Sequence, residues 1–425
     1  MTNQKLRILT VNVSDSSGGA ARAAYRIHKA TIEAGVDGQF LVKNKALNDP
    51  NVLTVQSFDS FSSFKAPFRW IQHKINNKLQ QARWRPYPNR QDVFMSDLRG
   101  SSLHGALQKI EYDILHLHWI NLRFIDINDL AKITKPIVWT LHDCWPFTGV
   151  CHYFYDCTRY KQSCGCCPHL ASNNKKDLSH KVWKKKMEIF SKLNIHVVCP
   201  SNWLAQAARE SAIFKQFPVS VIPNPLDTNF FTPGSKVDAC KVLSISPEKR
   251  YILYGAMNAV KDRRKGFAEL KSCLQYYEKQ FDAKDIEVLI FGSNEKAQFE
   301  LNHIRTTDLG LLNDQQLRAA YRASDVMVTP SLSENLSNII MESLACGTPV
   351  VAFNIGGNSD MIDHKLNGYL AKSNDTEDLA KGINYCLDYN TENTLSEAAR
   401  KKVVDSFAVH LVGEKYIELY ESLIK

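Results

Sequence analysis

Short runs of apolar and β-branched residues recur along the first half of the chain, with helix-like stretches between them. These runs lie at residues 6–13, 39–42, 114–118, 137–141, 196–199 and 219–222. A glycine pair at Gly18 and Gly19 follows the first run and opens a helical stretch. Strands that alternate with helices are typical of βαβ units. The pattern therefore predicts a parallel sheet covered by helices.

The same alternation begins again in the second half of the chain. Strand candidates lie at residues 251–255, 286–292, 326–330 and 349–353. A proline-rich breaker at 223–227 separates the two series and marks a boundary. The sequence thus predicts two successive α/β domains, 1–222 and 223–408, followed by a final helical segment at 409–425.

The composition is that of an ordinary globular protein: 425 residues, 44% hydrophobic and 23% charged. It excludes a collagen, a fibre and a small disulfide scaffold. No apolar run approaches the ~18 residues of a membrane-spanning helix, and the first residues are too polar for a secretory signal. We therefore predict a cytoplasmic protein, in which the eleven cysteines stay reduced or hold metal.

Basic residues are concentrated in the first half. Residues 1–220 contain 30 Lys and Arg against 16 Asp and Glu, whereas residues 221–425 contain 23 against 28. The segment 61–90 interleaves aromatic and basic residues and contains no acid. The asymmetry predicts an anionic partner for the first half, and the segment suits a membrane surface. A solvated basic surface and a lid packed on its own domain are the alternatives.

The most specific motif occupies residues 331–351. A strand is expected to end at Pro330, and a helix to begin near Leu336 after a polar turn. Glu334 precedes this helix, and Glu342 lies two turns into it. The free N–H groups at a helix start suit phosphate, and carboxylates suit sugar hydroxyls. The motif therefore predicts a nucleotide-sugar site.

Together with the sequences at 347–351 (GTPVV) and 356–358 (GGN), this motif resembles the E-x7-E signature of the retaining GT-B glycosyltransferases of family 4. The resemblance extends over most of the chain and is strongest toward members of the colanic-acid and exopolysaccharide type. It implies an α/β GT-B fold, in which two Rossmann-like domains face each other across a cleft. The first domain would bind the acceptor and the second the nucleotide sugar, and the final helix would pack back on the first domain.

The resemblance also assigns donor-site residues. Glu342 would hold the nucleotide ribose, Glu334 would contact the donor sugar, and the backbone of Asn335, Leu336 and Ser337 would meet the pyrophosphate. Lys265 matches the phosphate-binding Lys-Gly of the family. Many members have an arginine six residues earlier, where this chain has Ala259. That departure leaves Arg263 or Arg264 to supply the second cation.

The first half contributes further candidates. Gly18 and Gly19 resemble the family's flexible loop near the donor phosphates, and His118 resembles the histidine beside the donor sugar. His142 and Asp143 follow the next strand and are candidates for orienting an acceptor, with an ordinary hydrogen-bonded pair as the alternative.

Six cysteines fall between Cys144 and Cys167. Of these, Cys151, Cys157, Cys164 and Cys167 fit a structural four-thiolate zinc site. A reduced loop or labile disulfides are equally compatible with the spacing.

The resemblance therefore implies a retaining glycosyltransferase that moves a hexose to a lipid-linked glycan during the synthesis of a bacterial capsule, exopolysaccharide or O-antigen. The acceptor is expected to carry a polyprenyl diphosphate, and the protein to lie peripherally on the anionic inner leaflet. No cofactor is expected for catalysis, because Lys265 and the helix start would stabilise the leaving group. The alternatives are a sugar-nucleotide epimerase, a phosphorylase and a nucleic-acid-binding protein, the last being disfavoured.

Overall fold

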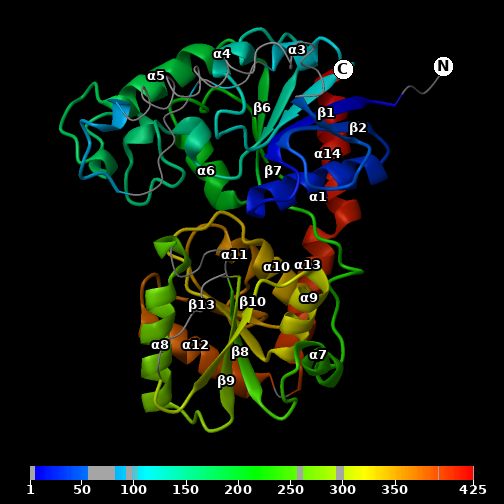
Figure 1. Cartoon of the computed structure of the whole chain (residues 1–425), viewed down its shortest axis with the longest axis vertical. Helices are drawn as coiled ribbons and strands as arrows, with labels where there is room; N and C mark the ends of the chain where they lie inside the picture. Colours follow the sequence, from blue (N-terminus) through cyan, green and yellow to red (C-terminus); the bar gives the residue numbers. More distant parts are fainter. Residues whose placement is uncertain are drawn as a thin grey trace, which may run out of the picture. The chain divides into compact units, whose positions relative to one another are not determined.

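The computed structural model describes residues 5–55, 82–91, 98, 100, 103–255, 262–292, 301–390 and 392–424. The chain forms two compact units, which Figure 1 shows in the colours of the sequence. The first unit comprises Met1–Ile222 and Gly413–Lys425, and the second comprises Pro223–Val412. Most of the aromatic and basic segment at 61–90, as well as Ala259, lies outside the described residues.

The first unit is built on a seven-stranded sheet in the order β3-β2-β1-β4-β5-β6-β7, and all neighbours pair in parallel. The strands are β1 (Arg7–Ser14), β2 (Asp37–Asn44), β3 (Val52–Thr54), β4 (Ile114–Leu117), β5 (Ile137–Thr140), β6 (Ile195–Cys199) and β7 (Val219–Val221). The helices are α1 (Gly19–Glu33), α3 (His104–Leu107), α4 (Ile127–Leu130), α5 (Leu178–Phe190) and α6 (Asn202–Glu210), with short 3₁₀ turns η2 (Trp145–Phe147), η3 (Arg159–Lys161) and η4 (Pro168–Leu170).

The second unit repeats this plan with six parallel strands in the order β10-β9-β8-β11-β12-β13. Its strands are β8 (Arg250–Gly255), β9 (Ile286–Phe291), β10 (Arg305–Gly310), β11 (Val326–Thr329), β12 (Val350–Phe353) and β13 (Gly368–Ala371). Its helices are α7 (Lys236–Leu243), η5 (Arg263–Lys265), α8 (Phe267–Gln280), α9 (Asp314–Ala323), α10 (Asn338–Ala345), α11 (Asn358–Met361), α12 (Thr376–Tyr389) and α13 (Thr394–Phe407).

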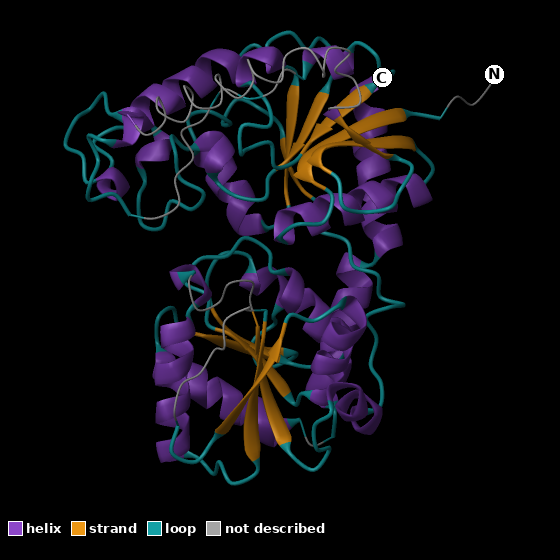
Figure 2. Cartoon of the chain, viewed as in Figure 1, coloured by secondary structure: helices purple, strands orange, loops and turns teal. Residues whose placement is uncertain are grey.

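Helices cover both faces of each sheet (Figure 2). In the second unit, α8 and α12 lie on one face, whereas α7, α9, α10 and α13 lie on the other (Figure 1). Strand β8 supplies Tyr251 and Leu253 to one core and Ile252 and Tyr254 to the other. Strands buried on both faces are continuously apolar, and this is why the sequence marks them so clearly.

Three strands were not predicted. Strand β10 is polar and lies at the sheet edge, where no residue of Arg305–Gly310 is fully buried. Strands β3 and β13 have three and four residues, too few for a recognisable pattern.

The helix expected to begin near Leu336 begins at Asn338. The main chain before it bonds to another loop instead, since the Asn335 carbonyl accepts from Gly357 N at 2.8 Å. The predicted start near Leu336 thus holds to within two residues, and Glu342 lies in the second turn of the helix.

The last helix, α14 (Val409–Ile424), contributes two buried tyrosines to the first unit. The Tyr416 hydroxyl lies 2.9 Å from Thr140 Oγ1 on β5, and the Tyr420 hydroxyl lies 2.7 Å from His116 Nδ1 on β4. A Cβ on Gly413 would lie 2.6 Å from the Ala30 carbonyl oxygen on α1, so the glycine permits close packing there. Within the described residues, no helix has both the length and the apolarity needed to cross a membrane.

Candidate active site

The second unit places Lys265 beside Glu334. Lys265 ends η5, and the next residue, Gly266, has φ +70°. A Cβ on Gly266 would lie 1.8 Å from the Pro330 carbonyl oxygen, so the corner before α8 packs directly on the end of β11. The Arg264 carbonyl also accepts from Leu332 N at 2.8 Å. These contacts bring Lys265 Nζ to 2.7 Å from Glu334 Oε2.

Glu334 is fixed from its other side by the predicted glycine loop. A Cβ on Gly356, which has φ +53°, would lie 1.7 Å from the Glu334 carbonyl oxygen. The Glu334 and Lys265 side chains are 13% and 21% exposed, so both remain accessible to a ligand. They lie beyond the carboxyl ends of β11 and β8, the edge at which parallel α/β sheets bind ligands. The structure thus brings together two residues that are 69 positions apart in sequence.

Glu342 lies deeper, on α10, where it is 1% exposed. Its Oε2 atom accepts a hydrogen bond from the Tyr321 hydroxyl of α9 at 2.9 Å. Asn335, Leu336 and Ser337 form the buried turn between the two glutamates. Sequence reasoning did not single out Tyr321, because an aromatic residue on an amphipathic helix is usually part of the core.

Arg264, a candidate for the second cation, is engaged with its own loop. Its Nη2 and Nε atoms lie 2.6 and 3.1 Å from the two carboxylate oxygens of Asp262. This pairing neutralises much of its charge. The assignment of Arg264 to the donor phosphates therefore stays a prediction.

In the first unit, Gly18 and Gly19 lie where β1 gives way to α1. Gly18 has φ +91°, a conformation that favours glycine, and no atom lies within 4 Å of a Cβ built on it. Gly19 is the first residue of α1. The loop is therefore open on the side where a Cβ would project.

His118 and His142 meet beyond β4 and β5, with His118 Nδ1 3.0 Å from His142 Nε2. His118 is 2% exposed, and its Nε2 atom has no hydrogen-bond partner within the described part of the chain. Burial lowers the pKa of His142 to about 4 and that of His116, behind His118, to about 3. Burial, and to a lesser extent the nearby His116, also hold the pKa of His118 well below its usual value. These imidazoles are neutral at pH 7.

Asp143 has partners that the sequence did not reveal. Its Oδ2 atom lies 2.8 Å from Trp119 Nε1 and 2.6 Å from His152 Nδ1, and its Oδ1 atom accepts from Trp145 N. Burial by itself would raise the pKa of Asp143, but His152 and these donors hold it below its usual value. His152 was missed because the sequence analysis of this loop considered only its cysteines.

The four cysteines of the predicted zinc site all lie in the segment between β5 and α5. Cys167 raises the pKa of the buried Cys151 thiol, and Cys151 lowers that of Cys167 to about 7, whereas Cys164 Sγ accepts from Gly149 N at 3.2 Å. No group of three or more metal-ligating side chains placed to hold an ion occurs among the described residues. All eleven cysteines are free thiols. The zinc site remains a prediction.

Comparison with protein families gives two matches that together cover most of the chain. Residues 17–230 match the model described as Glycosyltransferase Family 4, and residues 243–402 match Glycosyl transferases group 1. The first match alone covers half of the chain.

Two similar proteins come from Escherichia coli. The UDP-Gal:alpha-D-GlcNAc-diphosphoundecaprenol alpha-1,3-galactosyltransferase is 22% identical over 76% of this chain and 79% of its own length. The putative colanic acid biosynthesis glycosyl transferase WcaC of strain K12 is 24% identical over 82% of this chain and 83% of its own.

Solved structures share the fold. Sucrose-phosphate synthase from Thermosynechococcus elongatus aligns with a TM-score of 0.67 at 17% identity over 99% of both chains. HepE from Anabaena, in complex with UDP and glucose, aligns with a TM-score of 0.64 at 17% identity over 98% of this chain and 100% of its own. The architecture is that of the GT-B fold.

Proposed function

The chain belongs to glycosyltransferase family 4, and we propose that it transfers a hexose from a nucleotide sugar, with retention of anomeric configuration, to a lipid-linked glycan. One observation carries the donor half of this proposal. Lys265 and Glu334 meet at the carboxyl edge of the second sheet, and Glu342 is buried on α10, the helix that follows Glu334. A cation and two carboxylates at this edge suit a diphosphate and two sets of sugar hydroxyls.

In this proposal Lys265 stabilises the departing diphosphate. Its Nζ atom contacts Glu334 in the free protein, so the donor phosphate would share the ammonium with that carboxylate. A preorganised positive charge at the site of developing negative charge lowers the barrier without a metal ion. Glu334 would contact the donor sugar, Glu342 would hold the ribose, and His118, whose buried Nε2 atom has no partner among the described residues, would lie beside the sugar.

The first unit would bind the acceptor. His142, Asp143 and the newly identified His152 and Trp119 gather beyond the carboxyl ends of β4 and β5. An aromatic ring next to fixed hydrogen-bonding groups suits the apolar face and the hydroxyls of a sugar ring. The E. coli galactosyltransferase named above acts on a diphosphoundecaprenol-linked sugar. By analogy we propose a polyprenyl-diphosphate acceptor and a role in bacterial surface polysaccharide synthesis, on the inner face of the membrane.

A thermal-shift panel of UDP-, GDP-, ADP- and dTDP-sugars, with and without EDTA, tests the donor assignment. A ligand at 100 times its Kd stabilises the folded state by about 2.7 kcal/mol, which raises the melting temperature measurably. We expect UDP-sugars to stabilise the protein, since the HepE structure contains UDP, and the shift to persist in EDTA.

Transfer is then tested with the stabilising donor and a synthetic polyprenyl-diphosphate sugar, and the product anomer is read by NMR. An inverted product would overturn retention, and a panel without any shift would overturn the donor site. A loss of stability in EDTA without nucleotide would favour the zinc site.

A further inference from the structure

A cavity lies in the unit that contains Lys265 and Glu334, at the opposite edge of its sheet. Its volume is about 660 Å³. It is lined by Arg250 at the start of β8, Asp325 just before β11 and Pro349 just before β12. Lys265 and Glu334 lie beyond the carboxyl ends of these strands. The cavity is therefore separate from the proposed donor site.

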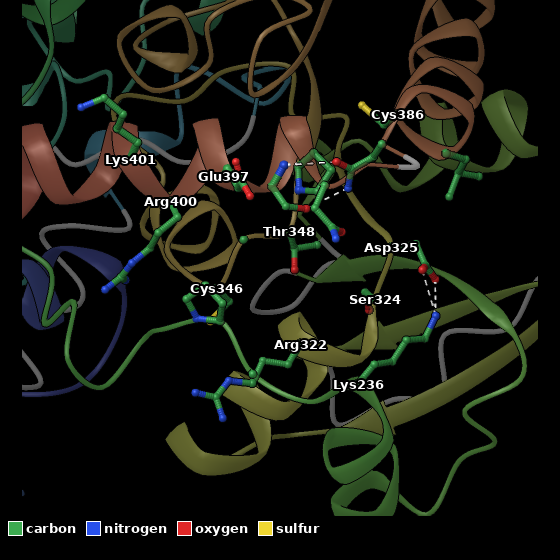
Figure 3. A pocket seen from close by; sticks show the side chains of 18 of the residues that line it. Lys236, Arg322, Ser324, Asp325, Cys346, Thr348, Cys386, Glu397, Arg400 and Lys401 are labelled. Atoms are coloured by element: carbon green, nitrogen blue, oxygen red, sulfur yellow. Dashed lines mark hydrogen bonds and ion pairs between the residues drawn. The ribbon is translucent and has the colours of Figure 1, made fainter.

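Two arginines lie on the same side of this cavity, Arg322 of α9 and Arg400 of α13 (Figure 3). The Arg322 Nε atom donates to the Thr232 carbonyl at 2.7 Å. Arg400 donates to the carbonyls of Thr228, Phe231 and Ala345 at 2.8, 2.7 and 3.0 Å.

Neither guanidinium has an acidic partner in the described part of the chain. A third arginine, Arg318, is close enough to lower the pKa of Arg322 further, after burial has done so. Arg318 donates to the Phe230 carbonyl at 3.3 Å, and it too has no carboxylate partner among the described residues. Backbone carbonyls orient these arginines but leave their formal charges uncompensated.

The other charged groups of the lining largely cancel. Lys236 pairs with Asp325 at 2.7 Å, and Lys401 pairs with Asp405 at 2.6 Å. Figure 3 shows the Lys236–Asp325 pair well apart from the two arginines. Arg250 lies 3.6 Å from Asp388, and Glu397 is the remaining acid of the lining. Glu397 lies one turn before Arg400 on α13 (Figure 3), so the arginine side of the cavity holds three arginines against one glutamate and is positive.

The rest of the lining combines apolar residues such as Leu387 and Val404 with uncharged hydrogen-bonding groups. The latter are the hydroxyls of Ser324, Thr348 and Ser396 and the amides of Asn390 and Asn393. A lone inorganic anion would leave most of a 660 Å³ cavity empty, whereas pockets of about 300–1,000 Å³ enclose small organic ligands. The lining therefore offers cations on one side and partners for hydroxyl groups around them.

We propose that this cavity binds a small phosphorylated polyol of the sugar-phosphate class, with its phosphate at Arg322 and Arg400. Guanidinium groups bind phosphate in a bidentate geometry and are less strongly hydrated than lysine ammonium groups. The terminal nitrogens of Arg322 have no partner among the described residues and are available for this contact. The hydroxyls of the ligand donate to the oxygens of Ser324 and Thr348, whose own protons go to the Ala320 and Tyr321 carbonyls. The exposed amide of Asn393 offers a further partner.

Isothermal titration of the full chain with glucose 6-phosphate, inorganic phosphate and glucose tests the proposal. We expect saturable binding of glucose 6-phosphate, weaker binding of phosphate and none of glucose. The titration is repeated with Lys265→Ala, which weakens phosphate binding at the donor site. Binding that persists there but falls about tenfold or more in Arg322→Gln belongs to this cavity.

Asn393→Asp provides a second variant that keeps the fold. Asn393 is an exposed residue of the lining with φ +58°, a conformation that Asp tolerates, and it precedes α13. The added negative charge should weaken glucose 6-phosphate binding several-fold.

Asn313→Asp is the matched control, because Asn313 caps α9 at the end of the helix away from Arg322. It should bind glucose 6-phosphate as the wild type does. Absence of saturable binding, equal binding of glucose, or wild-type affinity in both Arg322→Gln and Asn393→Asp would overturn the proposal.

Discussion

At the scale of single residues, the ammonium group of Lys265 is already paired with the carboxylate of Glu334. Its contact with Glu334 orders both side chains before a donor arrives. Replacing Lys265 by Ala should lower kcat by about 10²–10³-fold, the loss typical of removing one transition-state donor. Steady-state kinetics with the stabilising nucleotide sugar would measure it. The exposed Lys271 on α8 is the control, and unchanged kinetics in Lys265→Ala would refute its role.

Glu342→Gln tests the ribose contact, because it preserves the shape of a side chain that is 1% exposed. The Tyr321 hydroxyl still has an amide oxygen to donate to, so the fold should be kept. Hydrogen bonds to a charged group are worth more than neutral ones, so the Kd of the nucleotide sugar should rise about 10–100-fold. Titration calorimetry would measure it, with the exposed Glu377→Gln as control. An unchanged Kd would place the ribose elsewhere.

The sequence motifs predicted that Lys265, Glu334 and Glu342 belong to one site, and the structure brings Lys265 and Glu334 into contact. The motifs could not show that Asp262 engages Arg264 or that Tyr321 holds Glu342. Nor did they reveal His152 against Asp143. Such partners come from loops and helix faces whose approach depends on tertiary packing, and no local pattern encodes it.

At the scale of elements, the corner between η5 and α8 depends on one glycine. Gly266→Ala would force a Cβ against the Pro330 carbonyl and place alanine at positive φ. Gly310 also has positive φ, +65°, but open space around its Cβ position. Gly310→Ala should therefore cost only the ~1–2 kcal/mol of the backbone conformation.

Overpacking adds typically 1–3 kcal/mol, so Gly266→Ala should lose more unfolding free energy than Gly310→Ala by about that amount. Urea denaturation would measure both variants. Equal losses would mean that the corner can relax.

Two buried histidines, His116 on β4 and His142 after β5, predict a pH dependence of stability. The folded pKa of His116 is about 3 and that of His142 about 4, both below the unfolded value of 6.5. As the pH falls from 6.5 toward 4, the unfolded chain gains protons that the folded chain does not. Each histidine then lowers the free energy of unfolding by about 1.4 kcal/mol per pH unit. Above pH 6.5 this effect vanishes.

Urea denaturation at pH 7.5 and 5.5 measures the pH slope. His116→Gln should flatten it, whatever its effect on absolute stability. Replacing the exposed His303 by Gln should keep the wild-type slope, and an identical slope in all three proteins would contradict the prediction.

Strands could be predicted where both faces are buried, as at Ile252–Tyr254, because such segments are apolar at every position. The edge strand β10 is polar and gave no signal. The start of α10 was expected near Leu336 and lies at Asn338; the sequence could not show that the preceding Asn335 carbonyl bonds to Gly357. The limit in each case is a contact with a distant part of the chain.

At the scale of the whole molecule, the excess of basic residues in the first half is the feature that predicts binding to an anionic membrane. Residues 1–220 carry 30 basic against 16 acidic residues. The protein should bind phosphatidylglycerol vesicles at low salt and release them near 0.5 M NaCl, because screening shortens the range of the attraction. Co-sedimentation would measure this, with phosphatidylcholine vesicles as control. Salt-sensitive binding to DNA in place of vesicles would favour the nucleic-acid alternative.

The tyrosines of α14 also impose an order on biosynthesis. Tyr416 and Tyr420 follow their partners Thr140 and His116 by 276 and 304 residues. At ~5–20 residues per second, a ribosome needs on the order of 15–60 s to cover that distance. During this time the whole second unit emerges, while the first lacks the helix that covers His116. We therefore expect the first unit, which is synthesised first, to complete its fold last. The N-terminal part of the nascent chain should then need protection from aggregation for the longest time.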